Sequence, residues 1–326
     1  MSTQTEPLVS IGIPTYNRAA DYLPVALGSA LAQDYANLEI IVSDNASTDG
    51  TADFVKSKND ARIRFFRHEE NIGPANNPNF CVEQARGAYF LLLHDDDMID
   101  PDFVSVCMRA VDGNPNVGVV RTGIRVIDAE GRPVSFSENV AEGLSFEGFL
   151  RAWFTGKTAH YLPNTLFNTA GLKKFGGFHS KTYMFEDAVA LVRLASELGR
   201  IDIREVKASF RRHGQNLGGH PSRARDWLKD CVYLRDVIME RVAEHESKAV
   251  YRDATRFLCR TSYRHASAVP SLVDRWVMYW EVFAAFGYSH LPPRAWHPRE
   301  SMSRLQRRLS RLVRMMGTAS TKESSR

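Results

Sequence analysis

The sequence predicts an α/β fold, in which a mostly parallel sheet carries helices on both faces and is followed by a C-terminal α-helical extension. Over the first 125 residues, short apolar runs alternate with segments of helical length. Such alternation indicates parallel strands joined by crossover helices that cover the sheet. After residue 219, apolar residues recur instead at helical spacing. These two patterns divide the chain into residues 1–219 and a helical region at 220–326.

The expected elements can be placed in chain order. Strands are expected at residues 8–13, 38–43, 63–68, 88–94 and 117–123, and helices at about 21–33, 50–58, 74–86 and 101–112. The stretch "RVIDAEGRPVSF" then predicts a hairpin around Glu130 and Gly131, and mixed, turn-rich sequence continues to about residue 219. Residues 1–219 thus have a first half that ends near 123 and a second half that begins near 124. In the helical region, five apolar residues share one face: Tyr233, Leu234, Val237, Ile238 and Val242.

The composition is that of a folded globular protein. Of 326 residues, 44% are hydrophobic and 25% are charged, which excludes a disordered or fibrous chain. The four cysteines lie far apart without a CxxC pair, which argues against a zinc site and a disulfide framework. The start of the chain lacks the pattern of a secretory signal, and no stretch approaches the roughly 18 apolar residues of a membrane span. We therefore expect a cytoplasmic protein.

Polar clusters follow three of the expected strands. They are "PTYNR" (14–18), "SDNASTDGT" (43–51) and "HDDDMIDP" (94–101). Ligands of open α/β sheets bind at the carboxyl ends of the strands, where loops project from a rigid sheet. We therefore expect the three clusters to converge on one edge of the sheet.

The third cluster places Asp95, Asp96 and Asp97 directly after a buried strand. Adjacent carboxylates repel each other unless a cation neutralises them, and oxygen ligands suit Mg²⁺ or Mn²⁺. These ions usually bind through one or two carboxylates together with substrate phosphates, so the cluster predicts a phosphate-bearing ligand. The alternative is a solvated turn in which Asp97 or Asp100 caps a helix that begins at Pro101.

The first two clusters have a structural and a functional interpretation each. Tyr16 either packs in a turn, with Asn17 in a permissive conformation, or offers an aromatic face to a nucleobase. Ser47, Thr48 or Asp49 could cap the helix that follows. A cap leaves Asp44 and Asn45 unexplained, and these side chains could form hydrogen bonds with the edge of a base.

Together these segments resemble the GT-A glycosyltransferases of family 2, which are inverting enzymes that use nucleotide-sugars. The resemblance covers about residues 8–216 and lies in the order of five segments: "VSIGIPTYNR", "LEIIVSDNASTDGT", "ENIGPANNPNFCVEQARGAYFLLLHDDD", "FEDAVALVRLASELG" and "RRHGQN". It implies a GT-A type nucleotide-binding sheet. It also implies a donor site built from Thr15, Tyr16, Asn17, Asp44, Asn45, Asn71, Gly73, Asn79 and Asp95. The family often has two acidic residues where this chain has Asp44 and Asn45.

The resemblance also implies the metal site and the catalytic base. The D-x-D motif of the family begins at Asp95 or at His94, depending on placement, so that Asp96 is the favoured ligand of Mn²⁺ or Mg²⁺, followed by Asp95 and Asp97. His213 would approach the metal or the diphosphate, and Arg211 and Arg212 would face the phosphates. The family places the base that deprotonates the acceptor hydroxyl in the pair Glu186 and Asp187, of which we favour Asp187. The alternative is an acidic pair that only stabilises the start of a helix.

The C-terminal segment 299–316 is a predicted basic amphipathic helix. Met302, Leu305, Leu309, Leu312 and Met316 form one stripe, and arginines surround it. Such a helix is typical of a membrane-surface anchor, which would place the protein on the inner face of the membrane. The alternative is a helix that docks on the protein itself or on a second subunit.

The sequence therefore predicts a metal-dependent inverting glycosyltransferase that acts on a saccharide or lipid-linked acceptor, in surface polysaccharide or glycan biosynthesis. The alternative is a catalytically silent nucleotide-sugar-binding or scaffold protein of the same fold. A nucleotidyltransferase would need a glycine-rich, lysine-bearing loop where this chain has "PTYNRAADY", and a dinucleotide-binding oxidoreductase would need G-x-G-x-x-G there. We expect no nucleic-acid partner.

Overall fold

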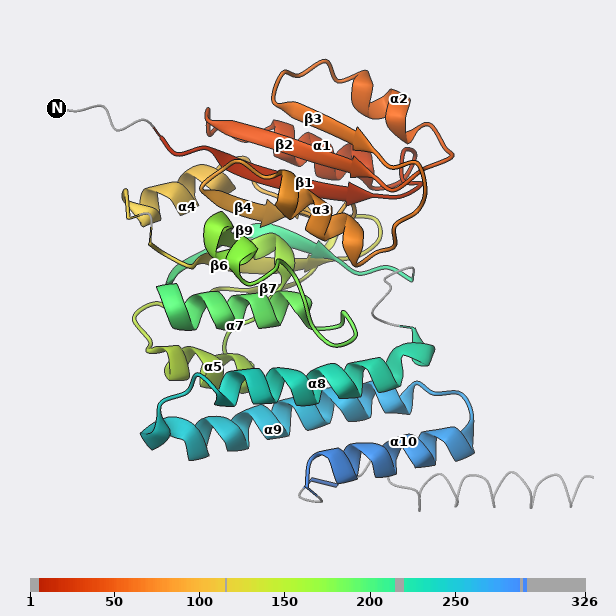
Figure 1. Ribbon diagram of the computed structural model, residues 1–326, viewed down its shortest axis with the longest axis vertical. Helices are drawn as coiled ribbons and strands as arrows, with labels where there is room; N and C mark the ends of the chain where they lie inside the picture. The colour runs from red at the N-terminus through yellow and green to blue at the C-terminus, as the bar shows by residue number, and fades with distance from the viewer. Residues whose placement is uncertain (1–5, 115, 215–219, 288–289, 292–326) are drawn as a thin grey trace, which may run out of the picture.

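The computed structural model describes residues 6–114, 116–214, 220–287 and 290–291. Within this part of the chain, one sheet has the strand order β3-β2-β1-β4-β8-β6-β9-β5, with β7 paired to β6. The strands are β1 (Val9–Thr15), β2 (Leu38–Asp44), β3 (Ile63–Arg67), β4 (Tyr89–Leu92), β5 (Met98–Ile99), β6 (Val119–Ile127), β7 (Pro133–Ser137), β8 (Thr165–Asn168) and β9 (Arg200–Arg211). Figure 1 shows this sheet above a stack of helices.

Most of the sheet runs in one direction. β3, β2, β1 and β4 pair in parallel. β8 is antiparallel to both β4 and β6, so β6 runs the same way as β4, and β9 is parallel to β6. The predicted mostly parallel α/β sheet is confirmed.

The helices cover both faces of the sheet. They are α1 (Leu23–Leu31), α2 (Thr51–Lys56), α3 (Asn76–Gln84), α4 (Phe103–Val111), α5 (Phe146–Phe154), α6 (Thr169–Lys174) and α7 (Glu186–Leu198). Neighbouring residues of β4 serve opposite faces, because side chains alternate along a strand. Tyr89 and Leu91 belong to the core that contains α1 and α4, whereas Phe90 and Leu92 belong to the core that contains α3, α5 and α7.

The predicted elements of the first half agree with the structure to within a few residues, and the hairpin is present as β6 and β7. Gly131 in its turn has a φ of +84°, which favours glycine. The region up to residue 219, expected to be turn-rich, is more regular than that, because it also holds α5 to α7, β8 and β9. β8 has only four residues, and β9 carries many charged side chains, so neither resembles the apolar runs of the first strands.

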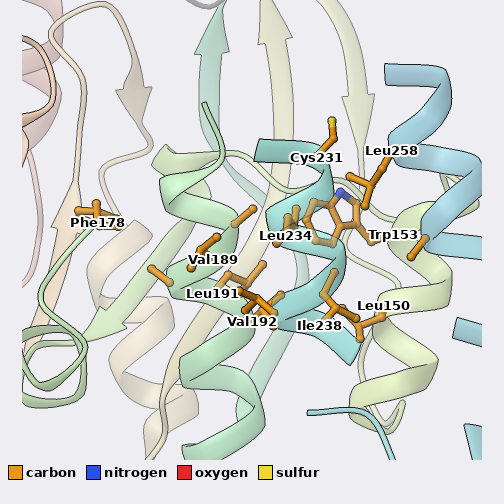
Figure 2. Close-up of a cluster of buried hydrophobic side chains, with 14 of the residues drawn as sticks. Leu150, Trp153, Phe178, Val189, Leu191, Val192, Cys231, Leu234, Ile238 and Leu258 are labelled. Atoms are coloured by element: carbon orange, nitrogen blue, oxygen red, sulfur yellow. The ribbon is translucent and has the colours of Figure 1, made fainter. Parts of the chain in front are cut away.

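The C-terminal extension comprises α8 (Ala224–Met239), α9 (Glu244–Ser267) and α10 (Leu272–Ala285). Of the apolar face predicted there, Leu234, Val237 and Ile238 are buried, and Tyr233 and Val242 are partly buried. Figure 2 shows Leu234 and Ile238 of α8 beside Leu191 and Val192 of α7, so one core continues from the sheet into the extension.

Two further predictions concern the C-terminal part of the chain. The predicted amphipathic segment 299–316 lies outside the described residues. Among the helices that are described, none is both long enough and apolar enough to cross a membrane.

Candidate functional site

The loops after β1 and β2 lie against each other at the carboxyl ends of the strands. Thr15 pairs in register with Asp44, and the Asn45 amide donates to the Thr15 carbonyl at 2.9 Å. Asn17 has a φ of +52°, and its amide donates to Ser47 Oγ at 2.8 Å. The predicted convergence of the first two clusters is confirmed, as is the permissive conformation of Asn17.

Tyr16 is exposed at this edge, whereas Asp44 is buried. The Tyr16 side chain is 46% exposed. Asp44 is buried, and its Oδ1 accepts from the Ser47 amide at 2.9 Å. Its Oδ2 lies 3.6 Å from Arg67 Nε and has no hydrogen bond within the described part of the chain. The contacts of these two residues with a nucleotide stay predictions.

The side chain of Asn45 forms hydrogen bonds with the loop that contains Asn71 and Ile72. Its Oδ1 accepts from the Ile72 amide at 2.8 Å, and its Nδ2 donates to Asn71 Oδ1 at 2.9 Å. Asn71 Oδ1 also accepts from the amide of Gly73, whose φ is +88°. An amide side chain can donate and accept at once, which a second aspartate could not do here. The departure from two acidic residues thus has a structural consequence, because Asn45 orders the predicted donor loop.

Asn79 lies beyond this loop and clamps a distant segment. Its Oδ1 accepts from the Phe178 amide at 2.8 Å, and its Nδ2 donates to the Phe178 carbonyl at 3.0 Å. A Cβ at the preceding Gly177 would lie 2.3 Å from Asn79 Oδ1, and the φ of Gly177 is +85°. Glycine is therefore required for this contact, which connects the donor half to the segment before α7.

The acidic loop after β4 contains a compact group of ligand atoms. His94, Asp96 and Asp97 each offer one such atom, and all three atoms lie within 4.8 Å of one another. Asp97 is buried; its Oδ1 accepts from the Arg211 amide at 2.9 Å, and its Oδ2 has no hydrogen bond among the described residues. A buried carboxylate oxygen of this kind is costly without a partner, so the group fits a hard divalent cation.

Asp95 and His213 lie next to this group rather than within it. Burial and the Asp96 carboxylate raise the pKa of Asp95 to about 6, and the same two causes raise the pKa of Asp97 well above its usual range. His213 Nε2 lies 2.8 Å from Asp96 Oδ2. Of the four predicted ligands, Asp96 and Asp97 are in the group together with His94, the alternative start of the D-x-D motif. The roles of Asp95 and His213 toward a metal stay predictions.

The alternative interpretation of the acidic loop as a helix cap is wrong. Helix α4 begins at Phe103, and its N-cap residue Asp102 makes no side-chain hydrogen bond to it. Asp97 accepts from the backbone of Arg211, and both carboxylate oxygens of Asp100 accept from the Arg125 guanidinium at 2.6 and 2.8 Å. These carboxylates are engaged with β9 and β6, respectively.

The Arg211 side chain connects the acidic loop to the turn after β6 through hydrogen bonds to backbone carbonyls. Its Nε donates to the Asp96 carbonyl at 2.8 Å, and its Nη1 donates to the carbonyls of Asp128 and Ala129 at 3.2 and 3.1 Å. Its guanidinium also lies over the Tyr22 ring, 4.7 Å from the ring centroid. The phosphate contact predicted for Arg211 stays a prediction, and the structure adds this bracing contact.

Glu186 and Asp187 are the first two residues of α7, where the helix dipole favours negative charge, as the alternative interpretation also expects. Asp187 Oδ2 lies 3.2 Å from Nε2 of the buried His160. Burial alone would raise the pKa of Asp187, but His160 outweighs it, and the pKa lies below its ordinary value. For Glu186, burial and then the Asp187 charge raise the pKa to about 7. The pKa values of these two adjacent carboxyls are thus shifted in opposite directions, which is typical of catalytic pairs.

His160 is the site residue that sequence reasoning missed. It stands in an irregular stretch, and nothing in its spacing points to Asp187. The neighbouring Tyr161 links this pair to the acidic loop, because its hydroxyl accepts from Arg212 Nη2 at 3.0 Å, and Arg212 is flanked by Arg211 and His213. The predicted base is thus connected to the predicted metal ligands by two side-chain contacts and by neighbouring residues in the chain, and the charge of His94 is among the causes that lower the pKa of Asp187.

The chain also matches a known family over about half of its length. A family model described as Glycosyl transferase family 2 matches residues 10–175. The chain belongs to this family. The matched residues of the family 2 chain include the three strand-end clusters and His160, whereas Glu186 and Asp187 lie beyond the match.

Individual relatives agree with this assignment. The family 2 chain is 27% identical over 281 residues to GalNAc(5)-diNAcBac-PP-undecaprenol beta-1,3-glucosyltransferase of Campylobacter jejuni, a match that covers 83% of this chain and 85% of that protein. Three other curated relatives, among them the chondroitin synthases of Escherichia coli and Pasteurella multocida, are much longer proteins, of which the match spans 13% to 21%.

Two solved structures share the fold. A crystal structure of S. aureus TarS 1–349 in complex with UDP-GlcNAc has a TM-score of 0.67 at 21% identity, covering 86% of this chain and 81% of that one. The mannosyltransferase PcManGT from Pyrobaculum calidifontis, in complex with GDP-Man and Mn²⁺, has a TM-score of 0.53 at 21% identity, again over 86% and 81%. At these identities the likeness establishes the GT-A fold of the family 2 chain.

Proposed function

We propose that this chain is a metal-assisted inverting glycosyltransferase, which moves a sugar from a nucleotide-sugar to a hydroxyl of a saccharide or lipid-linked acceptor. One observation carries the proposal. A carboxyl pair whose pKa values are shifted in opposite directions, Glu186 and Asp187, has Asp187 against His160, and it is connected to the acidic loop by the Tyr161–Arg212 hydrogen bond and by the charge of His94. Sugar transfer needs these two parts side by side, a base for the acceptor and a centre of positive charge for the leaving diphosphate.

The donor would bind across the ends of β1, β2 and β4. Tyr16 offers a face for stacking on the base, and Asp44 Oδ2 is an acceptor for a base N–H group. Asn71 and Gly73 border the same edge through Asn45, and Asn79 would shape the donor site from the helix that follows this loop. The nucleotide-sugars in the two structural neighbours, UDP-GlcNAc and GDP-Man, support a diphosphate donor without naming its base.

His94, Asp96 and Asp97 would hold the divalent cation, with Asp95 and His213 beside them. When bound, such a cation offsets the negative charge that grows on the diphosphate. The Mn²⁺ bound to the mannosyltransferase neighbour supports a divalent ion of this type. Arg211 and the Asp97 carboxylate keep the loop in place through the backbone contacts described above.

Asp187 would act as the general base. Its side chain is 22% exposed, whereas one Glu186 oxygen is buried and has no hydrogen bond within the described residues. The acceptor oxygen forms a bond to the anomeric carbon and its proton passes to Asp187, while the bond between that carbon and the diphosphate oxygen breaks with its electrons. Attack opposite the leaving group inverts the anomeric centre. His160 orients Asp187 and keeps it ionised.

The acceptor and the location are also part of this proposal. The undecaprenol-linked substrate in the name of the Campylobacter relative supports a lipid-linked saccharide and a role in surface polysaccharide or glycan biosynthesis. We assign donor binding to residues 1–123, acceptor binding to 124–219, and a place at the inner membrane surface to the segment 299–316.

The test is release of nucleoside diphosphate from UDP-glucose, UDP-GlcNAc and GDP-mannose with Mn²⁺, combined with thermal unfolding in the presence of each nucleotide. A ligand at about 100 times its Kd should stabilise the wild type by about 2.7 kcal/mol. Asp96→Ala should abolish this stabilisation, and Asp236→Ala, which changes an exposed carboxylate on α8, should keep it. If no nucleotide stabilises the wild type at any Mn²⁺ concentration, the proposal is wrong and the silent scaffold interpretation takes its place.

A further inference from the structure

The segment that presents the catalytic pair has little structure of its own. Residues 180–185 form neither helix nor strand and lead directly into Glu186 and Asp187. Tyr183 within it has a φ of +57°, an unfavourable conformation for a bulky side chain. The N-cap residue Phe185 makes no side-chain hydrogen bond to α7. The place of the pair therefore depends on contacts from outside the segment.

Asp230 on α8 supplies four of these contacts. Its Oδ1 accepts from the Thr182 amide at 2.9 Å. Its Oδ2 accepts from Ser180 Oγ at 2.5 Å and from the amides of Met184 and Phe185 at 2.7 and 3.2 Å. All four donors lie in the six residues before Glu186, and three of them are backbone amides that have no other acceptor among the described residues. One carboxylate thus fixes the path of the whole segment.

The surroundings of Asp230 strengthen this anchor. Arg223 Nη2 donates to the Thr182 carbonyl at 2.9 Å, and Thr182 Oγ1 donates to the Asp226 carbonyl at 2.8 Å. Phe185 meets the Trp227 ring edge to face at 4.9 Å, and Trp227 stacks on His265 of α9 at 4.3 Å. Contacts from the start of α8 therefore hold both ends of the segment, and α9 supports Trp227 through His265.

Asp230 is also an unusual residue for a purely structural anchor. It is fully buried, and no lysine, arginine or histidine of the described chain forms an ion pair with it. A buried carboxylate is costly unless its oxygens accept several hydrogen bonds, and all of the donors here belong to the segment before the catalytic pair. Its charge is also one of the causes that raise the pKa of Glu186.

We infer that Asp230 is a positioning residue for the transfer reaction, through which the helical extension fixes the start of α7 and the place of the acceptor base. The extension is then part of the active site and not an appendage to a complete enzyme. Figure 1 shows the corresponding arrangement, with α7 between the sheet and α8. This inference rests on the proposed function for its kinetic consequence, but the anchoring itself can be measured without any substrate.

The experiment compares the full-length wild type with Asp230→Asn and with Asp253→Asn. Asp253 is a matched control, because it is a buried carboxylate of α9 whose partners are Arg151 and Arg252 and not the segment 180–185. Hydrogen exchange followed by mass spectrometry should show exchange at 182–187 accelerated about tenfold or more in Asp230→Asn only, with 10–50 unchanged. With UDP-GlcNAc and Mn²⁺ as the probe, kcat should fall on the order of 100-fold at an unchanged Kd for UDP.

The outcomes separate the inference from the proposed function. If the wild type releases no UDP but exchange at 182–187 changes as expected, the anchor stands and the donor assignment fails. If Asp230→Asn keeps wild-type exchange and kcat, or loses UDP binding in proportion to kcat, the positioning role is overturned. Should Asp230→Asn not fold, Ser180→Ala removes one donor without leaving a buried charge unpaired. It should lower kcat about fivefold at constant Kd, and a wild-type rate would equally overturn the inference.

Discussion

The donor edge and the acceptor edge of this site are built in different ways. At the donor edge, the loops after β1, β2 and β4 meet because parallel strands end side by side, and Thr15 lies opposite Asp44 by register alone. At the acceptor edge, Asp187 stands at the start of a helix and meets His160 and the Asp230-anchored segment through the packing of α5, α7, α8 and α9. The comparison teaches that a sheet positions a ligand site locally, whereas the catalytic pair depends on long-range packing.

The two edges also differ in their electrostatics. On the acidic loop, burial and neighbouring carboxylates raise the pKa values of Asp95 and Asp97, a state that a bound cation would relieve. In the pair on α7 the two pKa values move apart, because burial and the Asp187 charge raise that of Glu186 whereas His160 lowers that of Asp187. The following predictions test this division, from the largest expected effect to the smallest.

Replacing the base should have the largest effect. Asp187→Asn should lower kcat/KM by about 10³ with the Kd for nucleotide unchanged, because a general base contributes about 10² to 10⁴. Glu197→Gln at the exposed end of the same helix is the control and should keep full activity. The measurement is steady-state release of nucleoside diphosphate. A greater loss of kcat/KM in Glu186→Gln than in Asp187→Asn would show that Glu186, and not Asp187, is the general base.

Removing a metal ligand should affect the other edge. Asp97→Asn should weaken nucleotide binding in the presence of Mn²⁺ by about 100-fold, because a buried carboxylate oxygen that faces the ion is lost. Without Mn²⁺, the mutant and the wild type should bind nucleotide equally weakly. Isothermal titration of UDP and GDP with and without Mn²⁺ checks this. Equal Mn²⁺ dependence in both proteins would show that the acidic loop does not bind the ion.

Glu186 should make stability depend on pH. Its folded pKa of about 7 lies above the ordinary value of 4.5, so the folded state holds this proton more tightly than the unfolded state does. The wild type should therefore lose stability as pH rises from about 5 to about 7, and Glu186→Gln should not, a difference on the order of 2 kcal/mol. Urea unfolding at pH 5, 6 and 7 measures it. Parallel curves for the two proteins would mean that Glu186 ionises normally.

The smallest expected effect concerns His160. In His160→Gln the pKa of Asp187 should rise toward or above its ordinary value, because the partner that lowers it is gone while burial remains. The acid limb of the profile of kcat/KM against pH should then move to higher pH, with about a tenfold loss on that limb and less loss above it. His245→Gln, at an exposed position on α9, is the control. An unchanged acid limb in His160→Gln would show that His160 does not control the ionisation of Asp187.

Much of the donor edge could be predicted from the sequence. The apolar runs before "PTYNR", "SDNASTDGT" and "HDDD" mark buried strands, and their alternation with helices determines where the loops after them lie. The details could not be predicted in the same way. Asn45 orders the loop at Asn71, and His94 lies with Asp96 and Asp97 in the ligand group. The sequence does not show which of several neighbouring polar residues makes such a contact, because this depends on the direction and burial of each side chain.

The sequence by itself determined the α/β class, the parallel first half, the helical extension and the family, because strand and helix periods and strand-end motifs are local signals. Tertiary structure alone decided that His160 faces Asp187, that Asp230 anchors the segment before α7, and that the pKa values of Glu186 and Asp187 shift in opposite directions. The physical reason is that these contacts join segments far apart in the chain through one shared core, and that desolvation depends on what packs around a group. Neither the long-range contacts of a residue nor its desolvation can be predicted from the residues next to it in the sequence.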